Sequence, residues 1–336
     1  MLRLPHFQYL APRELAEAAS LLHEHGPTAS LVAGGTDLFP NMKRRQQEPA
    51  VVIGLRAVPG LNAIEALENG HVRIGATASL QQIASNQQIQ QHYPALATAA
   101  HLVSTPHLRR MGTIGGNLCL DTRCTYYDQT YHWRKSIDFC MKKDGDICWV
   151  APGSPRCWAV SSSDTAPVAV SLRAQLRLVS TSGERSIDAG QFFNDDGIQY
   201  LTRRADEILT EILLPPAEGW RSTYLKLRRR GSFDFPILGV AAAARFEGDI
   251  VREVRIVLGA VASLPREATK AAQMLVGQRL TTEVIEAAAD AAAGPARPLD
   301  NTDLTHPYRK KVTRVYVARA LARLAGLDQG PALEAV

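Results

Sequence analysis

The sequence predicts an α+β protein in which two α/β subdomains precede a C-terminal domain of strands and helices. Strand-like apolar runs alternate with helical patterns through the first 216 residues. A Pro-Pro pair and a glycine then mark a linker at residues 215–219, and beyond it three strand candidates are followed by alanine-rich helices. We therefore expect domain boundaries that separate residues 1–57, 58–216 and 217–336.

The first segment predicts one helix followed by two short strands. Pro12 favours the helix start, Gly26 favours its end, and the apolar residues between them fall on one face. Apolar strand candidates follow at residues 30–32 and 50–53.

The later elements are predicted from the same periodicities. In the second segment we expect a long helical stretch at residues 80–103 and strands at residues 72–74, 174–179 and 207–214. In the third segment we expect strands at residues 223–228, 237–245 and 251–258, followed by helices at residues 282–293 and 308–324. A cysteine-rich insertion at about residues 122–158 interrupts the second segment.

The basic charge of the chain is scattered and indicates no polyanionic partner. The formal net charge is +5, yet the basic residues form only short clusters without a nucleic-acid recognition motif. No apolar stretch approaches the ~20 residues that a membrane span needs. Residues 1–6 lack the apolar core of a secretory signal. We expect a cytoplasmic protein that neither binds nucleic acid nor crosses a membrane.

Two glycine-rich segments beside strand-like sequence offer backbone groups to a phosphate. Gly34 and Gly35 precede Thr36 and Asp37, and a second glycine pair lies within residues 113–117. Glycine lets backbone N–H groups approach an anion, and successive N–H groups form a nest that can hold a pyrophosphate. The anionic Asp37 suits a ribose hydroxyl, or bracing of the turn, better than a phosphate. Neither segment is a G-x-G-x-x-G or a Walker A loop, so ordinary tight turns remain an alternative.

All five cysteines lie between residues 119 and 157, which is unusual for cysteines that only fill a core. Disulfides are rare in proteins that are not secreted, so the cluster indicates a metal site. Structural zinc favours closely spaced pairs, whereas here four, fifteen, seven and eight residues separate successive cysteines. The spacing is not a common ferredoxin pattern either, so it favours an iron–sulfur cluster over zinc only modestly.

The ordered motifs resemble the FAD-binding subunit of the xanthine oxidase and carbon monoxide dehydrogenase family. The resemblance begins at residues 31–38 and 113–118, continues at residues 163–167 and 224–229, and ends at residues 308–310, so it covers nearly the whole chain. It implies a PCMH-type FAD-binding domain of two α/β subdomains before the C-terminal domain. It also implies that FAD contacts Leu31, Val32, Ala33, Gly34, Gly35, Thr36, Asp37, Leu38, Thr113, Gly115, Gly116, Asn117, Asp164 and Lys226.

The cysteine insertion sharpens this resemblance. Most members of the family lack it, and its position is similar to that of an insertion in the β subunit of 4-hydroxybenzoyl-CoA reductase, which binds a [4Fe–4S] cluster. The resemblance implies that the cluster ligands are Cys124, Cys140, Cys148 and Cys157, and we assign Cys119 to packing beside the FAD site.

The chain shows no nucleophile elbow and no zinc-protease motif, which fits a subunit whose chemistry belongs to its cofactors. The resemblance implies a relay in which a ferredoxin-like donor reduces the cluster, then FAD, then partner subunits that dehydroxylate an aromatic acyl-CoA. Those partners are a large molybdopterin subunit and a small subunit with [2Fe–2S] clusters, in a dimer of heterotrimers. The alternatives are an aromatic or purine hydroxylase with outward electron flow, and a zinc-stabilised scaffold without redox activity.

Overall fold

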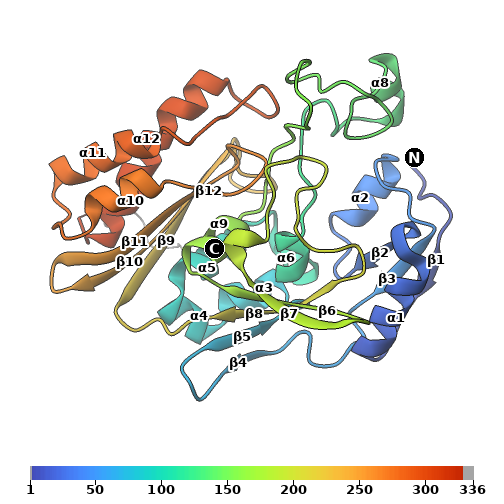
Figure 1. Cartoon of the computed structure of the whole chain (residues 1–336), viewed down its shortest axis with the longest axis horizontal. Helices are drawn as coiled ribbons and strands as arrows, with labels where there is room; N and C mark the ends of the chain where they lie inside the picture. The colour runs from blue at the N-terminus through green and yellow to red at the C-terminus, as the bar shows by residue number, and fades with distance from the viewer. Residues whose placement is uncertain (1, 328–336) are drawn as a thin grey trace.

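The computed structural model describes residues 2–327, and its strands form three sheets that follow one another along the chain (Figure 1). The first is a parallel sheet with the strand order β1-β3-β2, whose strands are β1 (Gln8–Leu10), β2 (Ala29–Val32) and β3 (Val51–Gly54). The helix α1 (Leu15–His25) buries Ala18, Ala19 and Leu22 in the same core as Ile53. The turn η1 (Gly26–Thr28) and the helix α2 (Leu38–Lys43) complete this part.

The second sheet is antiparallel, with the strand order β4-β5-β8-β6-β7. Its strands are β4 (Ile64–Ala66), β5 (Val72–Gly75), β6 (Gln175–Ser180), β7 (Gly183–Asp188) and β8 (Ile208–Leu214). Side chains along β6 alternate between buried and half-buried, as expected for a strand with one face on a core. The accompanying helices are α3 (Leu80–Ser85), α4 (Gln87–His92), α5 (Pro94–Leu102), α6 (Pro106–Met111), α7 (Ile114–Leu118), α9 (Thr165–Ser171) and η2 (Ala189–Gln191).

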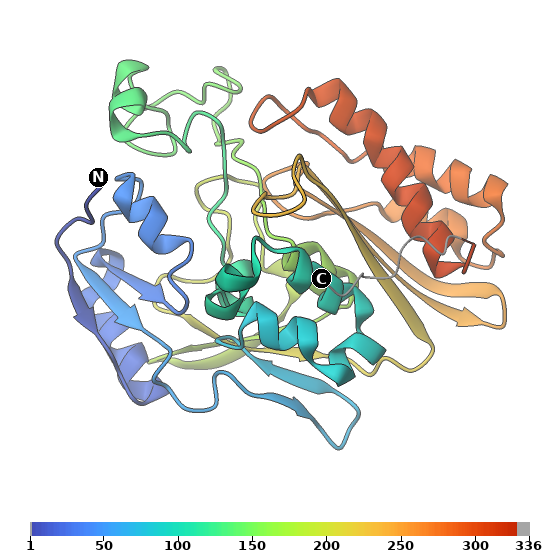
Figure 2. The ribbon, with the colours of Figure 1, turned by 180° about the vertical axis from the view of Figure 1, so that it is seen from behind.

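The third sheet is antiparallel in the order β12-β11-β10-β9, and helices lie beyond it (Figure 2). Its elements are β9 (Trp220–Leu227), β10 (Leu238–Glu247), β11 (Ile250–Gly259), β12 (Arg266–Glu267), α10 (Thr269–Leu275), α11 (Thr282–Ala292) and α12 (His306–Leu324). Successive residues of β10 enter different cores. Ala241 and Ala243 pack with the second sheet, while Val240, Ala242 and Ala244 pack with the C-terminal helices.

The insertion between residues 122 and 158 contains a single short helix, α8 (Tyr131–Ser136), among the described residues. In Figure 1 it rises away from the sheets, between α2 on one side and the loop before α12 on the other. Its remaining backbone is irregular apart from isolated bridges such as that between Arg123 and Val160.

The predicted α+β fold class is confirmed, with differences in detail. Residues 80–103 form α3, α4 and α5 instead of one helix, because Asn86 caps α4 and Pro94 begins α5. The sequence patterns missed the short strands β1 and β4, where too few residues carry a period. The domain boundaries predicted after residues 57 and 216 lie between sheets and stay a proposal. Of the helices that the structure describes, none combines the length and apolar character that crossing a membrane requires.

Candidate functional site

The two glycine-rich segments line one large pocket. Its volume is about 340 Å³, within the usual range for small-molecule sites. The first segment joins β2 to α2, and the second begins α7, so both stand at the start of a short helix. The predicted FAD contacts that line the pocket are Leu31, Val32, Ala33, Gly34, Gly35, Thr36, Asp37, Leu38, Thr113, Gly115, Gly116 and Asn117.

Gly34 and Gly35 are required because neighbouring groups lie too close to leave room for a side chain. A Cβ on Gly34 would overlap the carbonyl oxygen of Met111, and a Cβ on Gly35, whose φ is 69°, would overlap the ring of Phe39. Within the part of the chain that the structure describes, the backbone N–H groups of Gly34, Gly35 and Thr36 donate to no protein atom. Unpaired N–H groups in a concave turn form a nest for an anion.

The second glycine segment was expected to be a turn, and this expectation was wrong. Residues 114–118 form the helix α7, capped by Thr113, whose Oγ1 accepts a hydrogen bond from the N–H of Gly116 at 3.1 Å. The amide oxygen of Asn117 accepts hydrogen bonds from Ser163 Oγ and from the N–H and Oγ1 of Thr165. Asn117 therefore fixes α7 to the start of α9.

Asp37 braces the first glycine segment. Its carboxylate accepts hydrogen bonds from Arg123 Nη2 at 2.9 Å and from Asn41 Nδ2 at 3.0 Å. Burial raises the pKa of Asp37, and the neighbouring Arg123 opposes that shift. Arg123 also stacks on the ring of Phe235, 3.9 Å from the ring centroid, so the start of the insertion is tied to the pocket rim.

Asp164 and Lys226 were predicted to contact FAD, yet the structure places them behind the pocket wall. They form a buried ion pair at 2.8 Å, and Asp164 also accepts a hydrogen bond from the hydroxyl of Tyr224. Burial raises the pKa of Asp164 and lowers that of Lys226, while their contact offsets part of each shift. Lys226 Nζ also donates to the carbonyl of Leu102, whose neighbour Val103 lines the pocket. A contact of Asp164 and Lys226 with FAD stays a prediction.

The four predicted ligand cysteines surround a second, much smaller cavity of about 10 Å³. Cys124, Cys140, Cys148 and Cys157 are 4–7% exposed, and none forms a disulfide. Aromatic and apolar side chains, including Tyr126 and Trp149, complete the lining. Cys119 lies apart from them and lines the large pocket, as the sequence analysis expected.

Burial also governs the chemistry of these thiols. It raises the pKa of Cys124 to about 12 and that of Cys157 to about 11. Both side chains are therefore neutral thiols at neutral pH unless a bound cation displaces their protons.

Comparison with known proteins places the chain in a family. Residues 5–217 match the family of FAD-binding domains in molybdopterin dehydrogenase, and residues 222–324 match the C-terminal domain of the carbon monoxide dehydrogenase flavoprotein. The chain belongs to the FAD-binding subunits of the molybdopterin dehydrogenases. This membership confirms the predicted resemblance to the xanthine oxidase and carbon monoxide dehydrogenase family.

Individual relatives agree with this family of FAD-binding subunits. The carbon monoxide dehydrogenase medium chain of Hydrogenophaga pseudoflava is 30% identical over 94% of this chain and 96% of its own length. The nicotinate dehydrogenase FAD-subunit of Eubacterium barkeri is 30% identical over 84% of this chain and 83% of its own. A solved carbon monoxide dehydrogenase from H. pseudoflava, lacking the Mo-pyranopterin moiety, superposes with a TM-score of 0.80 at 29% identity, covering 97% of this chain and 99% of that chain.

The large pocket fits the FAD that this family binds. The nest at residues 34–36 suits a pyrophosphate, and Gly116 presents no side chain on the opposite loop. These relatives are named for carbon monoxide and nicotinate, so the expected likeness to 4-hydroxybenzoyl-CoA reductase stays a prediction.

Several pocket residues had no sequence signal. Ser104, Asp121, Tyr200, Arg203 and Phe235 line the pocket from segments far apart in the chain. None of them belongs to a recognisable motif, and only the tertiary fold brings them together. Asp121 could have been suspected, because it immediately precedes the cysteine insertion.

A metal at the cysteine cavity is not shown. No group of three or more His, Cys, Asp or Glu side chains between residues 2 and 327 is arranged to hold a metal ion. Four buried cysteines nevertheless line one cavity, and thiolates are the ligands of iron–sulfur clusters, so the residue types fit such a group.

Proposed function

We propose that this chain is the electron-transferring FAD subunit of a molybdenum hydroxylase or dehydrogenase, and that electrons leave the complex through it. The observation that carries the proposal is the pocket that both glycine segments line, because among the described residues the backbone N–H groups of Gly34, Gly35 and Thr36 in the first segment have no protein partner. The related medium chain of carbon monoxide dehydrogenase and FAD-subunit of nicotinate dehydrogenase support the outward direction, because both are named as dehydrogenases.

The residues of this chain bind and orient FAD. The redox chemistry is supplied by FAD, which exchanges one or two electrons when bound. The nest at Gly34 and Gly35 would hold the pyrophosphate, while Thr113 caps α7 and Asn117 fixes that helix to the start of α9. Asp37 is left to brace the first loop or to accept from a ribose hydroxyl. Substrate is oxidised on a partner subunit, and an external acceptor takes the electrons.

The partners proposed are a large molybdopterin subunit and a small subunit with [2Fe–2S] clusters, in a dimer of heterotrimers. This assignment is supported by family membership and by the solved relative, whose name records a molybdenum cofactor with a Mo-pyranopterin moiety. The identity of the substrate rests with the large subunit.

We further propose that Cys124, Cys140, Cys148 and Cys157 hold a [4Fe–4S] cluster. A single zinc ion binds four thiolates at about 2.3 Å each, which demands four mutually close sulfur atoms. A [4Fe–4S] cluster is also held by four thiolates, each on a separate iron atom, and four cysteines line this buried cavity.

The cysteine cavity favours a second candidate function. A cluster in the insertion would accept electrons from a ferredoxin-like donor and pass them inward, for reductive dehydroxylation of an aromatic acyl-CoA of the 4-hydroxybenzoyl-CoA type. The two functions share every residue of this chain and differ in the direction of electron flow.

The first test is an anaerobic visible spectrum of the purified protein with iron, zinc and flavin analysis. We expect flavin bands above a broad iron–sulfur shoulder, and about four iron atoms per chain on the stoichiometry of a four-cysteine cluster. A protein that contains flavin but no iron would refute the proposed cluster and leave the proposed FAD function intact. Zinc without flavin would overturn both and support a scaffold.

Cysteine variants test the ligand assignment. Cys140→Ser and Cys148→Ser should each lose the iron and keep most of the FAD, because the glycine pocket does not include them. Cys119→Ser is the matched control and should keep its iron. Full iron retention in both ligand variants would refute the assignment, and iron loss in the control would show that the wrong four were chosen.

A further inference from the structure

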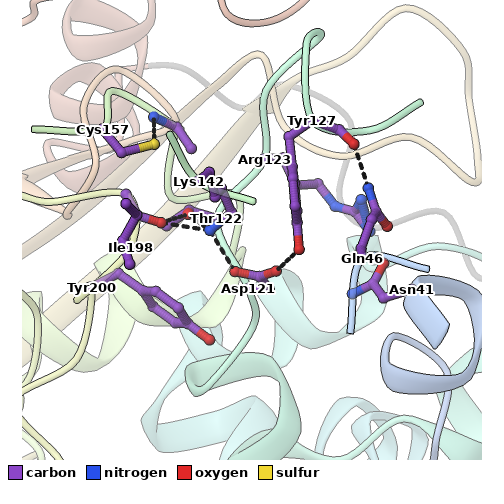
Figure 3. Close-up of polar contacts among 12 residues, drawn as sticks. Asn41, Gln46, Asp121, Thr122, Arg123, Tyr127, Lys142, Cys157, Ile198 and Tyr200 are labelled. Atoms are coloured by element: carbon purple, nitrogen blue, oxygen red, sulfur yellow. Dashed lines mark hydrogen bonds and ion pairs between the residues drawn. The ribbon is translucent and has the colours of Figure 1, made fainter. Parts of the chain in front are cut away.

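One buried ion pair lies between the flavin pocket and the cysteine cavity. Lys142 belongs to the insertion and lines the cysteine cavity, while Asp121 lines the flavin pocket. Lys142 Nζ lies 2.8 Å from Asp121 Oδ1, and the two side chains are 6% and 9% exposed. Figure 3 shows Lys142 directed toward Asp121, with Tyr200 beside the pair.

The position of the ammonium charge is fixed by its hydrogen bonds. Lys142 Nζ donates to Asp121 Oδ1, to Thr122 Oγ1 at 2.8 Å and to the carbonyl of Gly197 at 2.5 Å. An ammonium group has three N–H donors, so each is used. The charge also faces two aromatic rings, with the centroid of Tyr127 at 4.9 Å and that of Tyr200 at 5.4 Å.

The carboxylate is held as firmly as the ammonium. Asp121 Oδ2 accepts hydrogen bonds from the hydroxyl of Tyr127 at 3.1 Å and from Gln47 Nε2 at 3.2 Å. Tyr127 lines the cysteine cavity, whereas Gln47 lines the flavin pocket. The pair and its supporting groups therefore form a polar wall shared by both cavities.

An oriented pair of buried charges acts differently on its two sides. Coulomb interactions are stronger in a protected interior than in water, so each fixed charge affects the neighbouring cavity most. The ammonium at the cysteine cavity stabilises added negative charge there. The carboxylate at the flavin pocket disfavours added negative charge on the flavin.

We propose that Asp121 and Lys142 are positioning residues that raise the reduction potential of the group held by the four thiols relative to the flavin. This inference rests on the proposed function, because it needs both FAD and an iron–sulfur cluster. Each electron gained at the thiols is one lost by the flavin, so the pair favours transfer outward, from flavin to cluster. Charge and hydrogen bonding near a cluster are established means of setting its potential.

The test is a redox titration of the purified holoprotein, with iron and FAD contents measured on each variant. Lys142→Met removes the positive charge while keeping a chain of similar length, and should lower the cluster potential. Asp121→Asn leaves the ammonium unopposed and should raise the potentials of both cluster and flavin. Lys142→Arg should stay near the wild type. Lys143→Met is the matched control, because that side chain is 31% exposed, pairs with Asp144 and lines neither cavity, so it should change both potentials much less than Lys142→Met.

The two substitutions are expected to shift the cluster potential in opposite directions, and this distinguishes an electrostatic role of the pair from a purely structural one. A purely structural role predicts loss of iron in both Lys142→Met and Asp121→Asn, without opposite shifts in the molecules that keep it, and that result would overturn the inference. Retained iron and FAD with unmoved potentials would overturn it too, and would leave the proposed function intact. A wild-type protein without iron would overturn this inference together with the cluster.

Discussion

The flavin pocket and the cysteine cavity are adjacent, yet they are built in different ways. The pocket is lined by the ends of regular elements, where β2 leads to α2 and Thr113 begins α7. Its shape is set by backbone contacts, including the approach of Gly34 to Met111. Such contacts form only when the surrounding sheets are in place.

The cysteine cavity is enclosed by irregular chain that side chains fasten to its surroundings. Arg134 is 1% exposed and donates to the carbonyls of Arg44 and Arg45 after α2. At the other side, Asn301 Nδ2 donates to the carbonyl of Trp158, and the Asn301 carbonyl accepts from the N–H of Thr125. The insertion is thus attached to both the N-terminal and the C-terminal parts of the chain.

This difference indicates how each region responds to change. Elements that share a core lose stability together, whereas a segment held by a few hydrogen bonds can open locally. A cation bound by the four cysteines would join the loops of the insertion and add stability that they lack without it. We expect substitutions near the flavin pocket to affect the whole protein and those in the insertion to act locally.

The largest effect is expected for Lys226→Met, behind the flavin pocket. Lys226 and Asp164 are 1% and 3% exposed, so the variant leaves a carboxylate buried without its cation. Breaking a buried pair in this way costs about 3–5 kcal/mol of unfolding free energy. Chemical denaturation monitored by circular dichroism would measure it.

The matched control is Arg229→Met, which breaks the ion pair with Asp303. Those side chains are 62% and 55% exposed, so the loss should be at most about 1 kcal/mol. Equal effects in the two variants would contradict the contrast between a shared buried core and a solvent-exposed surface.

The sequence revealed those features whose chemistry is local. The glycine pair after the strand-like residues 30–32 predicted the first pocket loop, and the clustered cysteines predicted a second site. The helix α7 was missed because two glycines lower helix propensity, although Thr113 offered an N-cap signal. The Asp121–Lys142 contact could not be foreseen, because neither residue type nor spacing specifies which lysine returns to which carboxylate. Resemblance pointed to Asp164 and Lys226, but it did not show that they bind each other.

A smaller effect is expected for Gly34→Ala in the flavin pocket. The added methyl group would collide with the Met111 carbonyl, and overpacking of this kind costs about 1–3 kcal/mol. Separation of the two loops should also release FAD, which flavin fluorescence after gel filtration would detect. Gly153→Ala in the insertion is the control, because a Cβ there meets nothing within 4 Å. Comparable FAD loss in both variants would argue against the loop contact as its cause.

The smallest effect on overall stability is expected for Arg134→Met in the insertion. The substitution removes the donors to Arg44 and Arg45, and hydrogen bonds to a charged group contribute about 1.5–3 kcal/mol. Because no sheet depends on these bonds, the loss should appear as faster amide exchange confined to residues near α8, with an almost unchanged midpoint of global unfolding. Lys135→Met, on the exposed face of the same helix, should leave exchange unaltered. Global destabilisation by Arg134→Met would mean that the insertion folds as part of the common core, and the distinction between the two regions would then fail.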